Sequence, residues 1–159
     1  SIISQQLSGK AADTIFGRFK KLFRSEQITP AKLVKIPDEK IRSAGISWSK
    51  IKYIKGIAEE IINNRLNLKS LEDLSDEEVI SELVKLKGIG QWTAEMCLMF
   101  TLARPDIFSA GDLGLQNAMI RIYKLEQKPK REKLLEISAK WSPHRTFASR
   151  ILWRSLELK

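Results

Sequence analysis

Apolar residues recur along the chain at spacings of three and four, which is the period of an amphipathic α-helix. The clearest stripe consists of Ile51, Ile54, Ile57, Ala58, Ile61 and Ile62, with charged residues elsewhere on the same helix. No sustained alternation of apolar and polar residues, the pattern of a half-buried strand, occurs in the sequence. The chain is therefore expected to be all-α.

The same periodicity predicts helices before and after this stripe. They are expected at about 10–23, 30–35, 38–43, 76–85, 92–102, 113–123, 131–140 and 145–156. Ser75 followed by Glu78 is a capping-box pattern, which predicts where one helix starts. The five prolines avoid the interiors of these segments, where a missing amide and a fixed φ would disturb a helix most.

Charge is distributed unevenly over the 159 residues, whose net charge is +9. Lys and Arg outnumber Asp and Glu by ten to four in residues 1–50 and by twelve to six in residues 101–159. Acidic residues lead by nine to six in residues 51–100. Both ends of the chain therefore supply basic surface, which favours a polyanionic partner.

Composition also excludes several classes of protein. The single cysteine, Cys97, rules out an intramolecular disulfide and any cluster or zinc site built on several thiolates. No apolar stretch is long enough for a transmembrane helix, and residues 1–10 do not resemble a signal peptide. We expect a soluble protein without a membrane partner. Residues 1–7 look like a helix already under way, so we also expect an N-terminal portion to be missing.

Two glycines enclose an apolar residue in the stretch Leu86-Lys87-Gly88-Ile89-Gly90-Gln91-Trp92-Thr93-Ala94, which lies between two predicted helices. Glycines permit a tight turn with positive φ. The amides of Gly88, Gly90 and Gln91 can then point outward at the start of the next helix and bind a phosphate oxygen. Such a short glycine pattern also occurs in ordinary helix connections, so its context decides between these interpretations.

That context is a loop with Pro105 that leads to Asp112 at the start of the predicted helix 113–123. The hairpin, the loop and the aspartate together resemble the signature of helix-hairpin-helix (HhH-GPD) DNA glycosylases, and more narrowly the 3-methyladenine DNA glycosylase II (alkylbase) branch. The resemblance extends from Ile3-Ser4-Gln5-Gln6-Leu7-Ser8 to Trp141-Ser142-Pro143-His144-Arg145-Thr146-Phe147-Ala148 and Leu152-Trp153.

The resemblance implies a two-lobed, all-helical glycosylase fold with a DNA-binding cleft. One lobe would comprise about 25–105, with the hairpin at 86–92, and the second would combine about 1–24 with 106–159. The expected partner is double-stranded DNA containing a damaged base. We expect a monomer that works in the cytoplasm of a bacterium or archaeon, or in the nucleus of a eukaryote.

The resemblance implies that Asp112 is the catalytic aspartate of base excision repair. It would promote hydrolysis of the N-glycosidic bond of an alkylated base and leave an abasic site. Stabilisation of the cationic sugar and activation of water as a general base are both open roles. An Asp before a helix is also a standard N-cap. Bifunctional relatives carry a lysine where this chain has Trp92, so we expect a monofunctional hydrolase without lyase activity.

Trp92 and Trp153 are expected in the base pocket, because an indole face attracts an alkylated purine whose ring is positively charged. Plain core packing is the alternative for each tryptophan. Met96, one turn after Trp92, lines the same pocket or belongs to the core. Trp48 and Trp141 are interpreted as packing residues.

The residues expected to bind DNA lie at the hairpin and near the start of the chain. They are Lys87, Gly88, Gly90, Gln91 and Thr93 at the hairpin and Gln6 and Leu7 near the start. Gln6, with Leu7 as its alternative, would fill the space that a flipped base leaves in the duplex. An exposed polar residue at a helix end is the other interpretation of Gln6.

No cofactor or catalytic metal is expected. The resemblance implies that carbonyl groups of Val84, Leu86 and Ile89 hold a structural monovalent cation. Two rival functions remain open at this point. One is a non-catalytic helix-hairpin-helix DNA-binding module in which Asp112 merely caps its helix. The other is a glycosylase for an oxidised, deaminated or mismatched base.

Overall fold

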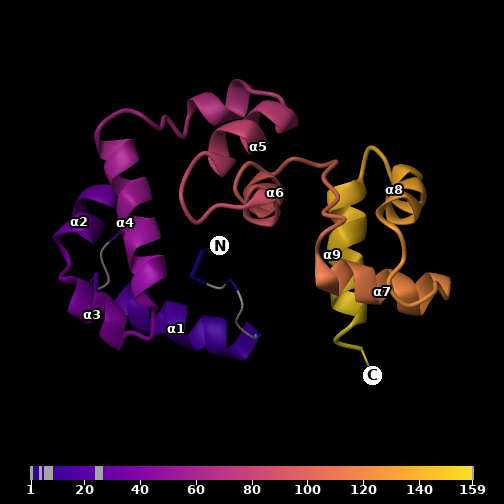
Figure 1. The fold of residues 1–159 in the computed structure, drawn as a ribbon, viewed down its shortest axis with the longest axis horizontal. Helices are drawn as coiled ribbons and strands as arrows, with labels where there is room; N and C mark the ends of the chain where they lie inside the picture. The colour runs from indigo at the N-terminus through magenta and orange to yellow at the C-terminus, as the bar shows by residue number, and fades with distance from the viewer. Residues whose placement is uncertain (1, 4, 6–8, 24–26, 159) are drawn as a thin grey trace. The chain divides into compact units, whose positions relative to one another are not determined.

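The computed structural model describes residues 2–3, 5, 9–23 and 27–158. Within these residues the chain forms nine α-helices, one 3₁₀ helix and no strand, which confirms the all-α prediction. The chain divides into two compact units, Ser1–Thr93 and Ala94–Lys159 (Figure 1). None of the helices among the described residues is both long and apolar enough to cross a bilayer.

The first unit is built around the long helix α4. Its elements are α1 (Gly9–Lys21), α2 (Pro30–Lys35), α3 (Asp38–Ser43), α4 (Trp48–Ile62), the 3₁₀ helix η1 (Ser70–Asp73) and α5 (Asp76–Val84). Helices α2 and α3 pack against α4 (Figure 1). The core beneath them combines Ile3, Phe19, Phe23, Leu33, Ile41, Ala44, Ile46, Ile51 and Ala58. The predicted stripe of α4 therefore faces this core through Ile51 and Ala58.

Local capping explains where several helices of this unit begin. Ser75 Oγ accepts a hydrogen bond from Glu78 N at 3.2 Å, and Glu78 Oε2 accepts one from Ser75 N at 2.8 Å. This reciprocal pair confirms the predicted capping box of α5. Ser47 caps α4, which makes that helix start at Trp48. Trp48 is 53% exposed, so its interpretation as a packing residue was wrong.

The second unit carries the end of α6 (Gln91–Phe100) together with α7 (Leu113–Tyr123), α8 (Arg131–Ala139) and α9 (Arg145–Ser155). Helices α7 and α9 pack against each other (Figure 1). Their shared core consists of Phe108, Ala110, Leu115, Ala118, Met119, Leu134, Ile137 and Leu152. Trp141 packs at the edge of this core, in edge-to-face contact with the Phe108 ring, as the sequence predicted.

The start of α9 is tied to the loop that precedes α7. Arg145 donates from Nε to Asp106 Oδ1 at 2.8 Å and from Nη2 to Oδ2 at 3.0 Å. These hydrogen bonds hold the pKa of the Asp106 carboxyl well below its ordinary value of 3.8, and Ser142 adds a further donor. Thr146 Oγ1 accepts from Ile107 N at 3.0 Å and donates to Arg104 O at 2.7 Å. The loop and α9 are therefore joined at the end nearest to Arg145.

The division of the chain by contacts is not the one expected from the sequence. Residues of α1 share a core with α2, α3 and α4, and the division lies after Thr93. The expected two lobes, about 25–105 and about 1–24 with 106–159, stay a prediction.

Candidate active site

Asp112 is the N-cap residue of α7, in the position that the sequence predicted. Its Oδ1 accepts a hydrogen bond from Leu115 N at 2.7 Å, and its side chain lies at the positive end of the helix. The residue is 8% exposed. Capping therefore accounts for the local conformation of Asp112, and it also orients a buried carboxylate.

Trp153 brings α9 to this carboxylate. Its indole Nε1 donates a hydrogen bond to Asp112 Oδ1 at 2.8 Å. Gly114 allows the approach, because a Cβ at this position would lie 3.0 Å from Asp112 Oδ1 and 3.0 Å from Trp153 Cδ1. The structure thus joins two residues that the sequence placed in one site, and it adds a glycine that sequence reasoning missed.

Phe100 is a second residue that sequence reasoning missed. It ends α6 and is 59% exposed, although it is a large aromatic residue. Its ring centroid lies 5.9 Å from that of Trp153, with the two planes tilted by 31°. The exposed Phe100 ring and the half-buried Trp153 ring beside Asp112 offer a surface on which a flat base can stack. In the sequence Phe100 ends an apolar run that starts at Met96, and nothing in that run distinguishes it from core residues.

The turn that carries Asp112 is buried except at Gly111, and two of its carbonyl groups accept hydrogen bonds. Ser109 O accepts from Asp112 N at 3.1 Å, and Ala110 O accepts from Gln116 Nε2 at 2.8 Å. Ser109 is 0% exposed and Ala110 is 4% exposed. Such a turn leaves the carboxylate little freedom to change its direction.

The glycine hairpin lies in the first unit. Gly88 has a φ of +91°, as the turn prediction required, and Ile89 N donates to Leu86 O at 3.1 Å. A Cβ at Gly88 would lie 2.5 Å from Cδ2 of the Tyr53 ring. Gly88 is therefore needed both for the backbone conformation and for the close packing of Tyr53.

Gln5 fastens the start of the chain to this hairpin. Its Nε2 donates to Gly88 O at 3.0 Å and to Thr93 Oγ1 at 2.8 Å. Lys50 Nζ donates to Gln5 O at 2.6 Å and to Ile3 O at 3.1 Å. Sequence reasoning missed Gln5, because nothing in the pattern distinguishes it from the adjacent Gln6. The proposed wedge residues Gln6 and Leu7 lie outside the described residues.

The other predicted site residues differ in exposure. Lys87, Gly90 and Gln91 are exposed, whereas Thr93 and Met96 are each 8% exposed. The Thr93 hydroxyl already holds Gln5, and the burial of Met96 agrees with the core interpretation. Trp92 is half-buried and lines a pocket of about 450 Å³ with Gln5, Gly88, Ile89, Gly90 and Thr93. The roles of these predicted residues in binding DNA or the base stay predictions.

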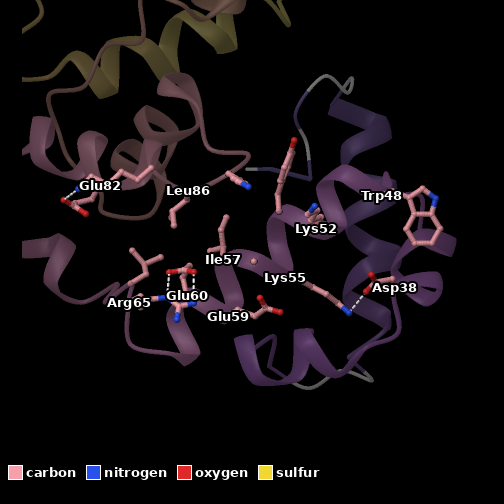
Figure 2. Close-up of a pocket in the computed structure, with 15 residues that line it drawn as sticks. Asp38, Trp48, Lys52, Lys55, Ile57, Glu59, Glu60, Arg65, Glu82 and Leu86 are labelled. Carbon is pink, nitrogen blue, oxygen red and sulfur yellow. Dashed lines mark hydrogen bonds and ion pairs between the residues drawn. The ribbon is translucent and has the colours of Figure 1, made fainter.

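A larger groove of about 840 Å³ runs along α4 towards Leu86 (Figure 2). Its charged groups are largely paired with one another, as Lys55 with Asp38, Arg65 with Glu60 and Lys85 with Glu82. Asp112 is not among its lining residues. This groove therefore does not contain the predicted catalytic residue, and the assignment of Asp112 stays a prediction.

Among the described residues, no cluster of three or more His, Cys, Asp and Glu side chains is arranged to hold a metal ion. The carbonyls of Val84, Leu86 and Ile89 are neutral oxygen donors, which suit a hard monovalent cation. Val84 ends α5, where helix carbonyls lack partners within the helix.

Comparisons with known proteins find similar folds among DNA glycosylases. The solved structure of Schizosaccharomyces pombe 3-methyladenine DNA glycosylase (Mag1) in complex with abasic DNA is similar, with a TM-score of 0.91 and 38% identity. The match covers 99% of this chain and 77% of that chain. The structure of DNA-3-methyladenine glycosidase from Bacillus halodurans has a TM-score of 0.81 and 41% identity, covering 97% of this chain and 71% of that chain.

The Bacillus subtilis protein YfjP is 35% identical over 162 residues, which are 98% of this chain and 56% of its own length. The chain thus spans little more than half of this curated relative. Residues 1–144 match the model of the HhH-GPD superfamily base excision DNA repair protein. By this match, and by the glycine hairpin and the capping Asp112 that the fold displays, the chain belongs to the HhH-GPD superfamily of base excision DNA repair proteins.

Proposed function

We propose that the chain carries the catalytic part of a DNA glycosylase that hydrolyses the N-glycosidic bond of alkylated bases of the 3-methyladenine type. The observation that carries the proposal is the buried carboxylate of Asp112, held by Trp153 at the start of α7. The names of the similar proteins from S. pombe and B. halodurans support this choice of substrate.

Asp112 would act on the sugar. When the N-glycosidic bond breaks, its electron pair leaves with the base, and positive charge develops on the sugar ring. The negative carboxylate stabilises this charge, because Leu115 N and Trp153 Nε1 hold one of its oxygens in a fixed direction. Water then adds to the sugar carbon, and its proton passes to Asp112 or to solvent. Both roles of the carboxylate, stabiliser and general base, are compatible with this position.

The aromatic pair would select the base. Trp153 uses its N–H on Asp112, so it can meet a base through its ring face, next to the exposed ring of Phe100. A cationic alkylated purine is attracted to such a face by about 2 kcal/mol when water is excluded. The same ring charge makes the base a good leaving group, so little protonation of the base is needed. Trp92 remains a predicted pocket residue.

The hairpin would bind the DNA backbone. Amides of Gly90 and Gln91 stand at the start of α6, where a phosphate oxygen is favoured, and the exposed Lys87 adds positive charge. Gln6 or Leu7 would fill the space left by the flipped base. A structural monovalent cation at the carbonyls of Val84, Leu86 and Ile89 would stiffen the hairpin. The protein would act as a monomer in the compartment that holds the DNA, cytoplasm or nucleus.

The decisive experiment measures free bases released from methylated duplex DNA. The wild-type chain is expected to release 3-methyladenine, and Asp112→Asn to lose about 100- to 1,000-fold in rate. Asparagine can still cap α7 and accept from Trp153, so binding of abasic duplex should persist in this variant. Duplex binding by the wild type without any base release would instead establish a non-catalytic DNA-binding module.

A panel of lesions tests the substrate class. 3-Methyladenine and 7-methylguanine are expected to be released in preference to hypoxanthine and 8-oxoguanine. A preference for either of the last two would assign the chain to another lesion.

Borohydride treatment during turnover tests the absence of lyase activity. No covalent protein–DNA complex is expected, because Trp92 stands where bifunctional relatives carry the attacking lysine. A trapped complex would contradict the monofunctional assignment.

A further inference from the structure

A buried carboxylate that the proposed chemistry does not use is bonded to the turn of Asp112. Glu95 lies on α6 and is 6% exposed. Ser109, which is 0% exposed, donates a hydrogen bond from its hydroxyl to Glu95 Oε2. An acidic side chain is seldom buried so deeply unless its hydrogen bonds are satisfied.

Ser109 connects this carboxylate to the catalytic position. Its hydroxyl is bonded to Glu95, while its backbone carbonyl accepts from Asp112 N at 3.1 Å. The next carbonyl of the turn, Ala110 O, accepts from Gln116 Nε2 at 2.8 Å. The turn is therefore held from α6 through Glu95 and from α7 through Gln116.

The acceptor oxygen of Glu95 gives this bond a physical role. A buried hydroxyl is costly without an acceptor, so a side-chain oxygen that accepts from Ser109 fixes the direction of its hydroxyl. An apolar side chain at position 95 would avoid the desolvation of a carboxyl group, but it could not direct Ser109. The arrangement thus favours a defined conformation of the turn over the lowest cost of burial.

We propose that Glu95 is a positioning residue for Asp112, acting through Ser109 to fix the turn that presents the catalytic carboxylate. The inference deepens the proposed function and rests on it. Misplacing a reacting group by about 1 Å can reduce a rate by about 100-fold, so an anchor of this kind matters to turnover. Glu95 itself touches neither base nor sugar in this role.

Ser109→Ala is the principal test, because it removes the hydroxyl and adds no bulk. Ser109→Ala and Glu95→Ala are each expected to lower kcat for release of 3-methyladenine by about 10- to 100-fold. The Kd for abasic duplex should stay within about twofold of the wild type, since the hairpin is unchanged. Glu95→Gln should keep most of the activity, because its amide oxygen still accepts from Ser109.

Ser138→Ala is the matched control. Ser138 is also buried in the second unit, at 1% exposed, and its hydroxyl donates to Leu135 O within α8. Its kcat should equal that of the wild type. A loss of kcat no larger in Ser109→Ala than in Ser138→Ala would overturn the proposal, as would an equal loss of abasic-DNA binding.

A spectroscopic readout separates this proposal from the proposed function. The indole N–H resonance of Trp153, assigned by its disappearance in Trp153→Phe, reports the hydrogen bond to Asp112 Oδ1. It should move upfield in Ser109→Ala and Glu95→Ala and stay in place in Ser138→Ala. An unmoved resonance would overturn the positioning role. If the wild type released no base, the proposed function would fail, and this resonance would still decide whether Glu95 positions Asp112.

Discussion

Trp153 Nε1 lies 2.8 Å from Asp112 Oδ1, so an aromatic residue of α9 holds the carboxylate that caps α7. The same oxygen accepts from Leu115 N at 2.7 Å. Asp112 Oδ1 thus links the start of α7 to the side of α9. The packing of α7 against α9 and the direction of the catalytic group are therefore coupled.

Trp153→Phe should separate the effect of the indole hydrogen bond from the effect of the aromatic ring. The variant keeps an aromatic face but loses the N–H donor, so we expect kcat for base release to fall about tenfold and stability to fall by about 1 kcal/mol. Trp141→Phe is the control, because Trp141 packs against the same core through the Phe108 ring. Equal activities of the two variants, measured by single-turnover base release, would mean that the indole N–H does not orient Asp112.

Gly114→Ala should disturb the same contact by sterics. The new Cβ would lie 3.0 Å from both Asp112 Oδ1 and Trp153 Cδ1, so the carboxylate or the indole must shift. We expect kcat to fall about tenfold while stability changes by less than about 1 kcal/mol, because alanine favours the helix. Gly17→Ala has open space around it and should stabilise α1 by about 0.5–1 kcal/mol at full activity. Full activity of Gly114→Ala would show that the contact between Asp112 and Trp153 does not depend on a glycine at position 114.

Gly88→Ala and Gly90→Ala should differ in stability. At Gly88 the φ of +91° and the Tyr53 ring both oppose a side chain, so alanine should cost about 2–4 kcal/mol. At Gly90 nothing lies within 4 Å of a Cβ, and the cost should be under about 1 kcal/mol. Urea unfolding of both variants measures the difference. Similar costs at the two positions would show that the Tyr53 contact is not tightly packed.

Low pH should remove the contribution of the Asp106 carboxylate to the free energy of unfolding. Because Arg145 lowers the folded-state pKa below the ordinary 3.8, the stabilising effect is present above that value and declines as pH falls towards the lower folded pKa. Asp106→Asn should therefore cost about 1–2 kcal/mol at pH 7 and progressively less below about pH 4. Denaturant unfolding over this pH range provides the measurement.

The exposed pair of Glu136 with Lys133 on α8 serves as the comparison for Asp106. Glu136→Gln should change stability little at any pH, because solvent screens this pair. A cost of Asp106→Asn that did not depend on pH would indicate packing, and not charge, as the source of its effect.

Local features of this protein could be predicted from its sequence. The helical periodicity, the capping box of Ser75 with Glu78, the positive φ of Gly88 and the capping role of Asp112 all agree with the structure. Each of them depends on neighbours within a few residues, because caps and turns satisfy backbone groups of their own segment. The resemblance to HhH-GPD glycosylases also rested on such local motifs, and the family match confirms it.

The contacts that complete the site depend on the tertiary structure. Trp153 meets Asp112 across 41 residues, Gln5 meets Gly88 across 83, and Glu95 meets Ser109 across 14. Periodicity assigns a residue to a face of its helix, but it does not say which side chain of another helix lies opposite. The sequence by itself therefore determined which residue types and turns are present. Helix packing decided that the buried carboxylate of Asp112 accepts a hydrogen bond from the Trp153 indole. It also decided that the buried carboxylate of Glu95 accepts one from Ser109, in the turn that leads to Asp112.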